Sequence, residues 1–243
     1  MDRKIMLLTG ASRGIGHATV KRFSAAGWRV LTCSRQPFDP RCPWPGGAED
    51  HIQIDLSDAA ATLRAIEVVR GKLPKGKLHA LVNNAAISPK SEEGTRLNTL
   101  ETDLRIWAQV FNVNFFGPLV LARGLRDELV AAEGMIVNVT SMAGSRVHPF
   151  AGSAYATSKA ALAALTREMA NDFGPLGVRV NAIAPGEVNT ARLTSEAQGL
   201  ARAAPLGRAA EPDEVASVIE FLCAAGSSYV TGTEIEVNGG QHV

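Results

Sequence analysis

Short apolar runs alternate along the chain with longer stretches whose apolar residues recur every three or four positions. The short runs predict strands at residues 4–9, 29–34, 51–55, 78–82, 135–139, 178–183 and 233–237. The helical spacing predicts helices at residues 18–26, 58–73, 100–113, 115–131, 153–166 and 212–225. Strands that alternate with helices predict an α/β fold: one domain, residues 1–243, with a doubly wound parallel sheet of about seven strands.

Two segments depart from this alternation. Residues 36–50 contain Pro37, Pro40, Pro43 and Pro45, which exclude a regular helix, so a loop is expected where a crossover helix would normally lie. Residues 191–210 are polar and alanine-rich, with no strong apolar stripe. We interpret this second segment as a candidate substrate lid.

The composition narrows the class of protein. Apolar residues make up 46% of the chain, charged residues 20%, and the formal net charge is +1. This balance lacks the basic field of a nucleic-acid or membrane-surface binder, so neither partner is expected. The N-terminal apolar run is too short for a signal peptide or spanning helix, which predicts a cytoplasmic protein. Cys33, Cys42 and Cys223 lack metal-ligand spacing, so we expect free thiols and no metal site.

The first predicted strand ends in a glycine-rich turn that opens a helix. From Gly10 to Gly16 the sequence is Gly-Ala-Ser-Arg-Gly-Ile-Gly. Glycine allows a positive φ and a close backbone approach to a ligand, while free N–H groups at a helix start attract an anion such as a pyrophosphate. The turn therefore predicts a dinucleotide site, although its spacing differs from the usual Gly-x-Gly-x-x-Gly fingerprint.

The end of the second strand bears on the choice of dinucleotide. An acidic residue about 20 positions after the glycines usually accepts the ribose 2′-hydroxyl of NAD, whereas an arginine accommodates the 2′-phosphate of NADP. Here the strand ends in Ser34-Arg35 without an acid, and Arg13 in the glycine turn adds a second cation. We expect NADP to be favoured over NAD, with use of NAD as the alternative.

Tyr155 and Lys159 are four residues apart in an alanine-rich helical run, so their side chains share one face of the helix. A fixed cation beside a phenol favours the phenolate, which lets the tyrosine give or take a proton near neutral pH. Taken alone, the spacing also fits an ordinary helix face. Ser141 favours the catalytic interpretation, because the connection from it to this helix contains Gly144 and Pro149 and can fold the serine hydroxyl over the tyrosine. A hydrogen-bond donor beside an acid polarises and protonates a carbonyl.

In their order and separations these motifs resemble the classical short-chain dehydrogenase/reductase family over essentially the whole chain. The resemblance rests on Thr9 to Gly16, Asn83-Asn-Ala-Ala86, Asn114, Ser141, Tyr155-x-x-x-Lys159, and Pro185-Gly186 with Thr190. It implies a Rossmann fold and hydride transfer between a nicotinamide cofactor and a small carbonyl or alcohol substrate. The implied catalytic roles are general acid/base for Tyr155, support of that phenol and of the nicotinamide ribose for Lys159, substrate orientation for Ser141, and a proton relay for Asn114.

The resemblance also implies contacts along the cofactor. Asp55 is expected to contact the adenine, and Val188 and Thr190 to fix the nicotinamide carboxamide. The whole predicted cofactor-binding set is Gly10, Ser12, Arg13, Gly14, Ile15, Gly16, Ser34, Arg35, Asp55, Leu56, Asn83, Ala85, Tyr155, Lys159, Pro185, Gly186, Val188 and Thr190.

Some features lie outside these motifs. Ala86 stands where the family has glycine, a change of one methyl group. His148 is interpreted as a solvated loop residue, and Trp107 and Phe111 as a pair that packs a helix. The resemblance implies a homo-oligomer, a tetramer or a dimer. A non-catalytic dinucleotide sensor remains the alternative function, since a fold alone does not establish activity.

Overall fold

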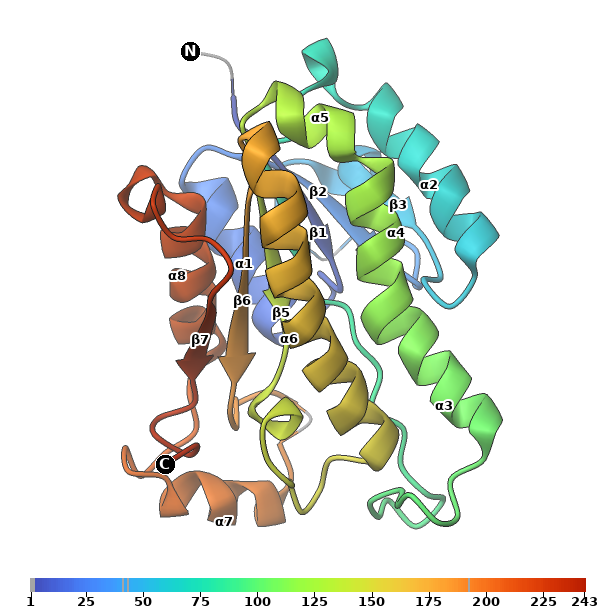
Figure 1. Cartoon of the computed structure of the whole chain (residues 1–243), viewed down its shortest axis with the longest axis vertical. Coiled ribbons are helices and arrows are strands. Elements are labelled where there is room, and N and C mark those ends of the chain that lie inside the picture. The colour runs from blue at the N-terminus through green and yellow to red at the C-terminus, as the bar shows by residue number, and fades with distance from the viewer. Residues whose placement is uncertain (1–2, 41, 43, 192) are drawn as a thin grey trace.

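The computed structural model describes residues 3–40, 42, 44–191 and 193–243. The first two residues, residues 41 and 43 of the predicted loop and residue 192 of the predicted lid lie outside the described residues. Within them, one parallel sheet of seven strands forms the centre, in the order β3-β2-β1-β4-β5-β6-β7 (Figure 1). The predicted doubly wound sheet is confirmed. The strand order reverses between β1 and β4, the place where open sheets of this kind bind ligands.

The strands and helices follow the predicted alternation. The strands are β1 Ile5–Thr9, β2 Arg29–Ser34, β3 His51–Gln53, β4 Ala80–Asn83, β5 Met135–Val139, β6 Arg179–Pro185 and β7 Glu234–Val237. The helices are α1 Gly14–Ala25, α2 Ala59–Gly71, α3 Leu104–Phe111, α4 Gly117–Gly124, α5 Arg126–Ala131, α6 Ser153–Phe173, α7 Ser195–Ala203 and α8 Pro212–Cys223.

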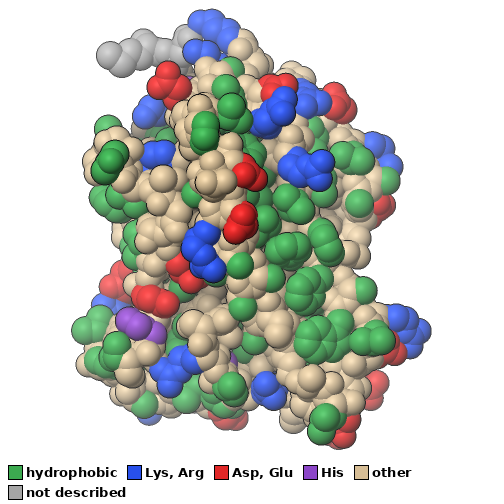
Figure 2. Space-filling view, viewed as in Figure 1, with side chains coloured by type: hydrophobic (Ala, Val, Ile, Leu, Met, Phe, Trp, Pro, Cys, Tyr) green, Lys and Arg blue, Asp and Glu red, His purple; other side chains and the backbone are tan. Residues whose placement is uncertain are grey.

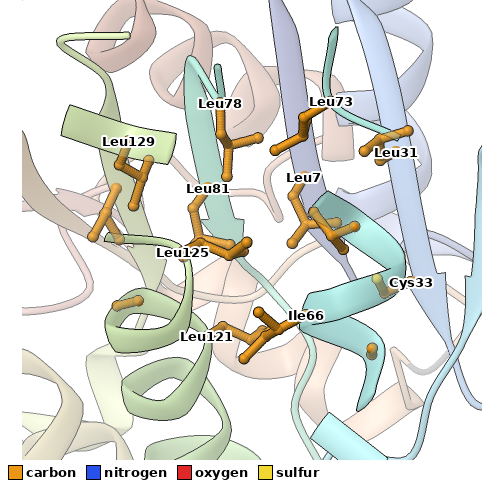
Figure 3. Close-up of a cluster of buried hydrophobic side chains, with 14 of the residues drawn as sticks. Leu7, Leu31, Cys33, Ile66, Leu73, Leu78, Leu81, Leu121, Leu125 and Leu129 are labelled. Carbon is orange, nitrogen blue, oxygen red and sulfur yellow. The ribbon is translucent and has the colours of Figure 1, made fainter. Parts of the chain in front are cut away.

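Two apolar clusters cover the two faces of the sheet. Successive side chains of a strand point to opposite faces, so in β1 Leu7 joins one cluster and Leu8 the other. The first cluster packs the sheet against α2, α4, α5 and α6, and Ile66 of α2 lies beside Leu121 of α4 in it (Figure 3). The second packs it against α1 and α8. Burying each such leucine or isoleucine stabilises the fold by about 1.5–3 kcal/mol, which holds the strand ends in fixed positions.

Several boundaries differ from the predicted ones. Helix α1 begins at Gly14, because the last glycines of the turn already form its first helical turn. The helix expected from residue 100 begins at Leu104, because Asp103 caps it by accepting a hydrogen bond from the Arg105 N–H at 2.7 Å. The helix expected at 115–131 is interrupted at Leu125, and a π-helical turn precedes it.

The proline-rich segment after β2 contains one 3₁₀ turn, Gly47–Asp50, and no α-helix among its described residues, as predicted. Arg29 forms an ion pair with Asp50 at 2.7 Å. The Trp44 ring packs edge-on against His17, with ring centroids 5.2 Å apart. These contacts fix the loop to the body of the domain.

Helix α7 lies within the predicted lid and was not expected from the sequence pattern. Thr194 caps its start by accepting a hydrogen bond from the Ala197 N–H at 3.3 Å. The helix lies beyond the carboxyl ends of the strands, away from the two helical layers (Figure 1). In the described part of the chain, no helix is long and apolar enough to span a membrane.

Candidate active site

A cavity of about 610 Å³ opens at the carboxyl ends of the central strands. The predicted site residues that line it are Gly10, Ser12, Arg13, Gly14, Ile15, Ser34, Arg35, Asp55, Leu56, Ala85, Tyr155, Gly186, Val188 and Thr190. Part of the predicted lid also lines it, through Ala191, Leu193 and Ala197. The fold therefore brings the glycine turn, the end of β2 and the tyrosine of α6 to one cavity.

The glycine turn fits a dinucleotide because it leaves no room for side chains. Gly10 has a φ of 72°, and a Cβ on it would lie 2.8 Å from both the Ala85 Cα and the Asn84 side-chain nitrogen. Arg13 precedes α1 and makes no side-chain cap, so the first N–H groups of the helix remain free to bind an anion. Gly16 does not line the cavity; its Cβ would lie 2.1 Å from the Gly10 carbonyl oxygen, so it serves close packing instead of cofactor contact.

Asn83 is expected to line the cofactor groove, but the structure does not place it among the residues that line the cavity. Strand β4 extends through Asn83, whose side chain is 2% exposed and donates to the Asn138 side chain at 2.9 Å. The next residue, Asn84, lines the cavity and donates to the carbonyl oxygens of Thr9 and Gly10 at 3.0 and 2.9 Å. Pro185 ends β6, is buried, and lies outside the cavity lining.

The end of the cavity near β2 carries both signs of charge. Arg13 and Arg35 line it together with Asp55. Hydrogen bonds from the backbone N–H and the hydroxyl of Ser57, at 2.9 and 2.8 Å, lower the pKa of Asp55, with a smaller contribution from Arg35. Asp55 is therefore an anionic hydrogen-bond acceptor at neutral pH, and the two arginines line the same cavity.

Lys159 lies beneath Tyr155 on α6. Its ammonium nitrogen is 5.8 Å from the centre of the Tyr155 ring and donates to the Val139 carbonyl oxygen at 2.6 Å. The side chain is fully buried, and this burial lowers the pKa of Lys159 from 10.5 to about 7. The predicted shared helix face is confirmed, and the lysine lies in the interior, outside the lining of the cavity.

Asn114 and Ser141, the other two predicted catalytic residues, are not among the described residues that line the cavity. Asn114 is fully buried: its side chain accepts from the Ile87 N–H at 2.9 Å and donates to the Ser158 hydroxyl at 3.0 Å, which ties the segment after β4 to α6. Ser141 follows β5, and its hydroxyl accepts from the Ala143 N–H at 3.2 Å. A Cβ on Gly144 would lie 2.8 Å from the Ala160 nitrogen, so this short turn packs directly on α6.

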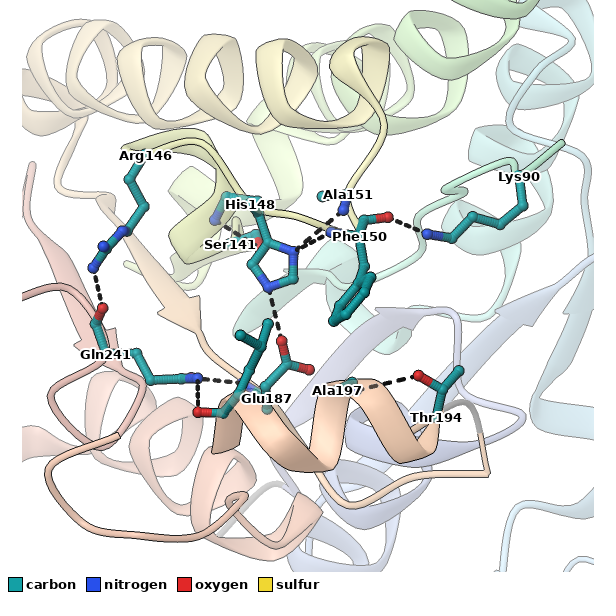
Figure 4. A network of polar contacts seen from close by, with 12 residues as sticks. Lys90, Ser141, Arg146, His148, Phe150, Ala151, Glu187, Thr194, Ala197 and Gln241 are labelled. Atoms are coloured by element: carbon teal, nitrogen blue, oxygen red, sulfur yellow. Dashed lines mark hydrogen bonds and ion pairs between the residues drawn. The ribbon is translucent and has the colours of Figure 1, made fainter. Parts of the chain in front are cut away.

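The interpretation of His148 as a solvated residue is wrong. Its side chain is 12% exposed, and its Nε2 lies 2.8 Å from the Glu187 carboxylate (Figure 4). Glu187 lines the cavity and was missed by the sequence analysis, although it lies inside the Pro185 to Thr190 motif. The predicted packing of Trp107 on Phe111 is confirmed, with ring centroids 6.5 Å apart.

Comparison with known proteins agrees with this geometry. The sequence profile of a family described as enoyl-(acyl carrier protein) reductase matches residues 10–242. The chain is 60% identical to Protein FixR of Bradyrhizobium diazoefficiens, over 100% of this chain and 88% of that protein. It is 32% identical to a meso-2,3-butanediol dehydrogenase of Serratia marcescens, over 98% of this chain and 94% of that protein.

A solved structure extends the comparison to three dimensions. An oxidoreductase of the short-chain dehydrogenase/reductase family from Brucella ovis, in complex with a partially ordered NAD, superposes with a TM-score of 0.86. The two chains are 61% identical, and the match covers 98% of this chain and 100% of the Brucella chain. With this fold, this cavity and these relatives, the chain belongs to the short-chain dehydrogenase/reductase family of oxidoreductases.

Proposed function

We propose that the protein is an NADP-dependent oxidoreductase that transfers a hydride between nicotinamide and a carbonyl or secondary-alcohol substrate. The observation that carries the proposal is the place of Tyr155, whose side chain lines the same cavity as the glycine turn. A bound NADPH would supply the hydride. The residues of this chain would bind that cofactor, orient the substrate and move the proton.

Tyr155 is the proposed general acid in the direction of reduction. Its phenol donates a proton to the carbonyl oxygen as the C–H bond forms, and takes the proton back from the alcohol in the reverse direction. The hydroxyl of Ser141 orients the substrate oxygen by a hydrogen bond. The Lys159 ammonium favours the phenolate, and because the pKa of Lys159 is about 7, this support varies with pH near neutrality.

The proposed preference for NADP rests on Arg13 and Arg35. Both line the cavity at the end of β2, where no acidic residue follows Ser34 to accept a ribose 2′-hydroxyl. Asp55 lines the cavity with these arginines, and two hydrogen bonds from Ser57 already engage one of its carboxylate oxygens. The Brucella ovis relative holds NAD, so a direct competition between the two cofactors is needed.

Fluorescence titration can measure the dissociation constants of NADPH and NADH for the native protein and for Arg35→Asp. We expect the native protein to bind NADPH at least about tenfold more tightly, and Arg35→Asp to remove or invert that ratio. Arg64→Asp is the matched control, because Arg64 is exposed on α2 and does not line the cavity. Equal affinities in the native protein would contradict the NADP assignment and leave the NAD alternative.

The reaction itself is tested by a screen of NADPH and NADH oxidation over ketones, aldehydes and acyl thioesters, with the alcohol product identified. We expect turnover of at least one carbonyl class and formation of the corresponding alcohol. Tight NADPH binding without turnover of any carbonyl or alcohol would instead support the non-catalytic sensor. Acyl thioesters belong in the screen because the matching family profile is described as an acyl carrier protein reductase.

We also propose a homo-oligomer, a dimer or a tetramer. Apolar side chains gather on the surface over α3 and α4 (Figure 2), where Leu104 is 80% exposed and Phe116 is 47% exposed. A patch of this kind is typical of a protein interface. Sedimentation at micromolar concentration provides the test, and a monomer would contradict the proposal.

A further inference from the structure

The cavity holds a carboxylate that the proposed proton transfer does not use. The charged residues among the described cavity lining are Arg13, Arg35, Asp55 and Glu187. The first three belong to the glycine turn and to the ends of β2 and β3. Glu187 follows β6 and faces the connection between β5 and α6, which carries Ser141 and leads to Tyr155 (Figure 4). It therefore lies at the end of the cavity where a substrate would bind.

The orientation of Glu187 is fixed by its neighbours. The Nδ1 atom of His148 accepts hydrogen bonds from the N–H groups of Phe150 and Ala151, each at 3.2 Å, so the ring hydrogen is on Nε2. His148 Nε2 then donates to Glu187 Oε1 at 2.8 Å. The Glu187 backbone N–H donates to the Gln241 side chain at 3.0 Å, so the C-terminal segment holds the main chain of the same residue.

The second carboxylate oxygen of Glu187 is open to the cavity. Among the described residues, none donates a hydrogen bond to Oε2. The atom is also not one of the sealed polar atoms that lack a partner. The side chain is 14% exposed, and the residue lines the cavity. Oε2 is thus an accessible, preoriented hydrogen-bond acceptor on a residue that lines the same cavity as Tyr155.

The neighbouring cations are directed at backbone atoms. Lys90 bonds its ammonium group to the Phe150 carbonyl oxygen, and the Arg96 Nε donates to the Ala151 carbonyl oxygen at 2.8 Å. They hold the segment whose N–H groups orient His148. Lys90 is also within electrostatic range of Glu187, and neither cation lines the cavity. Among the described residues, the charged group offered to a substrate at this end of the cavity is the Glu187 carboxylate.

We propose that Glu187 determines substrate specificity, and that the substrate is a hydroxyketone or polyol whose hydroxyl donates a hydrogen bond to Glu187 Oε2. His148 is the positioning residue that orients this carboxylate. The inference rests on the proposed oxidoreductase function and names its substrate class. Anionic keto acids are disfavoured, because a second carboxylate beside Glu187 is repelled and a buried acceptor without a donor is costly.

The test compares pairs of carbonyl compounds that differ by the hydroxyl: acetoin with butanone, and dihydroxyacetone with acetone. Acetoacetate serves as the anionic probe, and each is reduced with NADPH and with NADH. We expect kcat/KM for the hydroxyketone to exceed that of its partner by about tenfold or more, since a hydrogen bond to a charged group discriminates at this level. Glu187→Leu should reduce both ratios to about one.

Two further variants test the charge of Glu187 and its orientation by His148 separately. Glu187→Gln keeps an oxygen that accepts from His148 and presents its amide NH₂ group to the cavity. It should therefore raise the activity on acetoacetate relative to that on acetoin about fivefold. His148→Ala should lower the acetoin preference mainly through KM, with NADPH affinity unchanged. Glu168→Leu is the matched control, because Glu168 is exposed on α6 away from the cavity lining. A native ratio near one, or a ratio that Glu187→Leu leaves intact, would overturn the inference.

A binding measurement separates this inference from the reaction. With NADP⁺ at saturation, butanediol should raise the melting temperature of the native protein more than butanol does, and this difference should vanish in Glu187→Leu. If no probe is turned over but the diol effect is present, the proposed function fails and hydroxyl recognition by Glu187 stands. If the native protein shows no diol effect, recognition by Glu187 is refuted whatever the turnover.

Discussion

The two ends of the cavity are built in different ways. At the glycine-turn end the backbone forms the surface, and Gly10 and Gly16 leave no space for a Cβ. At the tyrosine end the Glu187 side chain lines the cavity, and it is held in place by His148 and Gln241, which come from two other segments. One end is encoded by a contiguous motif, and the other exists only once distant loops have packed. The cofactor class is therefore readable from local sequence, whereas the substrate class depends on tertiary contacts.

The largest effect is expected at the backbone end, from Gly16→Ala. The new Cβ would lie 2.1 Å from the Gly10 carbonyl oxygen and 2.9 Å from the Gly10 carbonyl carbon, and backbone atoms cannot move aside without displacing the turn. We expect NADPH affinity to fall by about 100-fold or more, as measured by fluorescence titration. Gly71→Ala is the control, because nothing lies within 4 Å of a Cβ at Gly71. A native dissociation constant in Gly16→Ala would show that this turn is not rigid.

Lys159, buried between the two ends, predicts a pH-dependent stability. Burial lowers its pKa in the folded protein from 10.5 to about 7, so between these values the unfolded chain binds a proton that the folded chain does not. The free energy of unfolding of the native protein, relative to Lys159→Met, should therefore rise with pH by about 1.4 kcal/mol per pH unit in this window.

Urea unfolding of both proteins without cofactor, from about pH 7 to about pH 9, measures this difference. The expected relative gain for the native protein is on the order of 2 kcal/mol. Below the folded pKa, lysine is protonated in both states and the difference should level off. Unfolding free energies that stay parallel across the window would mean that Lys159 is not desolvated in the folded protein.

A smaller effect is expected at the side-chain end, from Gln241→Ala. The variant removes the acceptor for the Glu187 N–H and the weaker hydrogen bond to the Leu200 carbonyl oxygen at 3.4 Å. We expect KM for a carbonyl substrate to rise about three- to tenfold, the effect of losing roughly one hydrogen bond, while NADPH affinity is unchanged. A parallel loss of cofactor affinity would show that the two ends are coupled through the C-terminal segment.

The sequence predicted what short-range patterns encode. The glycine turn, the Ser34-Arg35 strand end and the shared face of Tyr155 and Lys159 each lie within a few residues, and the structure places them as expected. The parallel sheet could be predicted because apolar strands and amphipathic helices alternate along the whole chain.

The errors arose where tertiary contacts decide the outcome. The resemblance implied that Asn83 contacts the cofactor, but strand β4 extends through Asn83 and its side chain bonds Asn138 of the neighbouring strand in the interior. His148 was assigned to solvent because its partner Glu187 is 39 residues away. Helix α7 is polar on average, and its buried residues Ala197 and Ala201 have small side chains, so its sequence gives only a weak helical signal.

In the proposed reaction, Tyr155 transfers the proton to the substrate oxygen, at the meeting point of the cofactor end and the substrate end of the cavity. The most direct test is the single-turnover rate of NADPH oxidation with a reducible carbonyl, measured for Tyr155→Phe alongside the NADPH dissociation constant. Tyr229→Phe is the matched control, because the chain has only two tyrosines and Tyr229 is fully exposed. We expect the NADPH dissociation constant of Tyr155→Phe to stay within about twofold of the native value and its single-turnover rate to fall at least about 100-fold. A Tyr155→Phe protein that binds NADPH and reduces substrate at the native rate would contradict it.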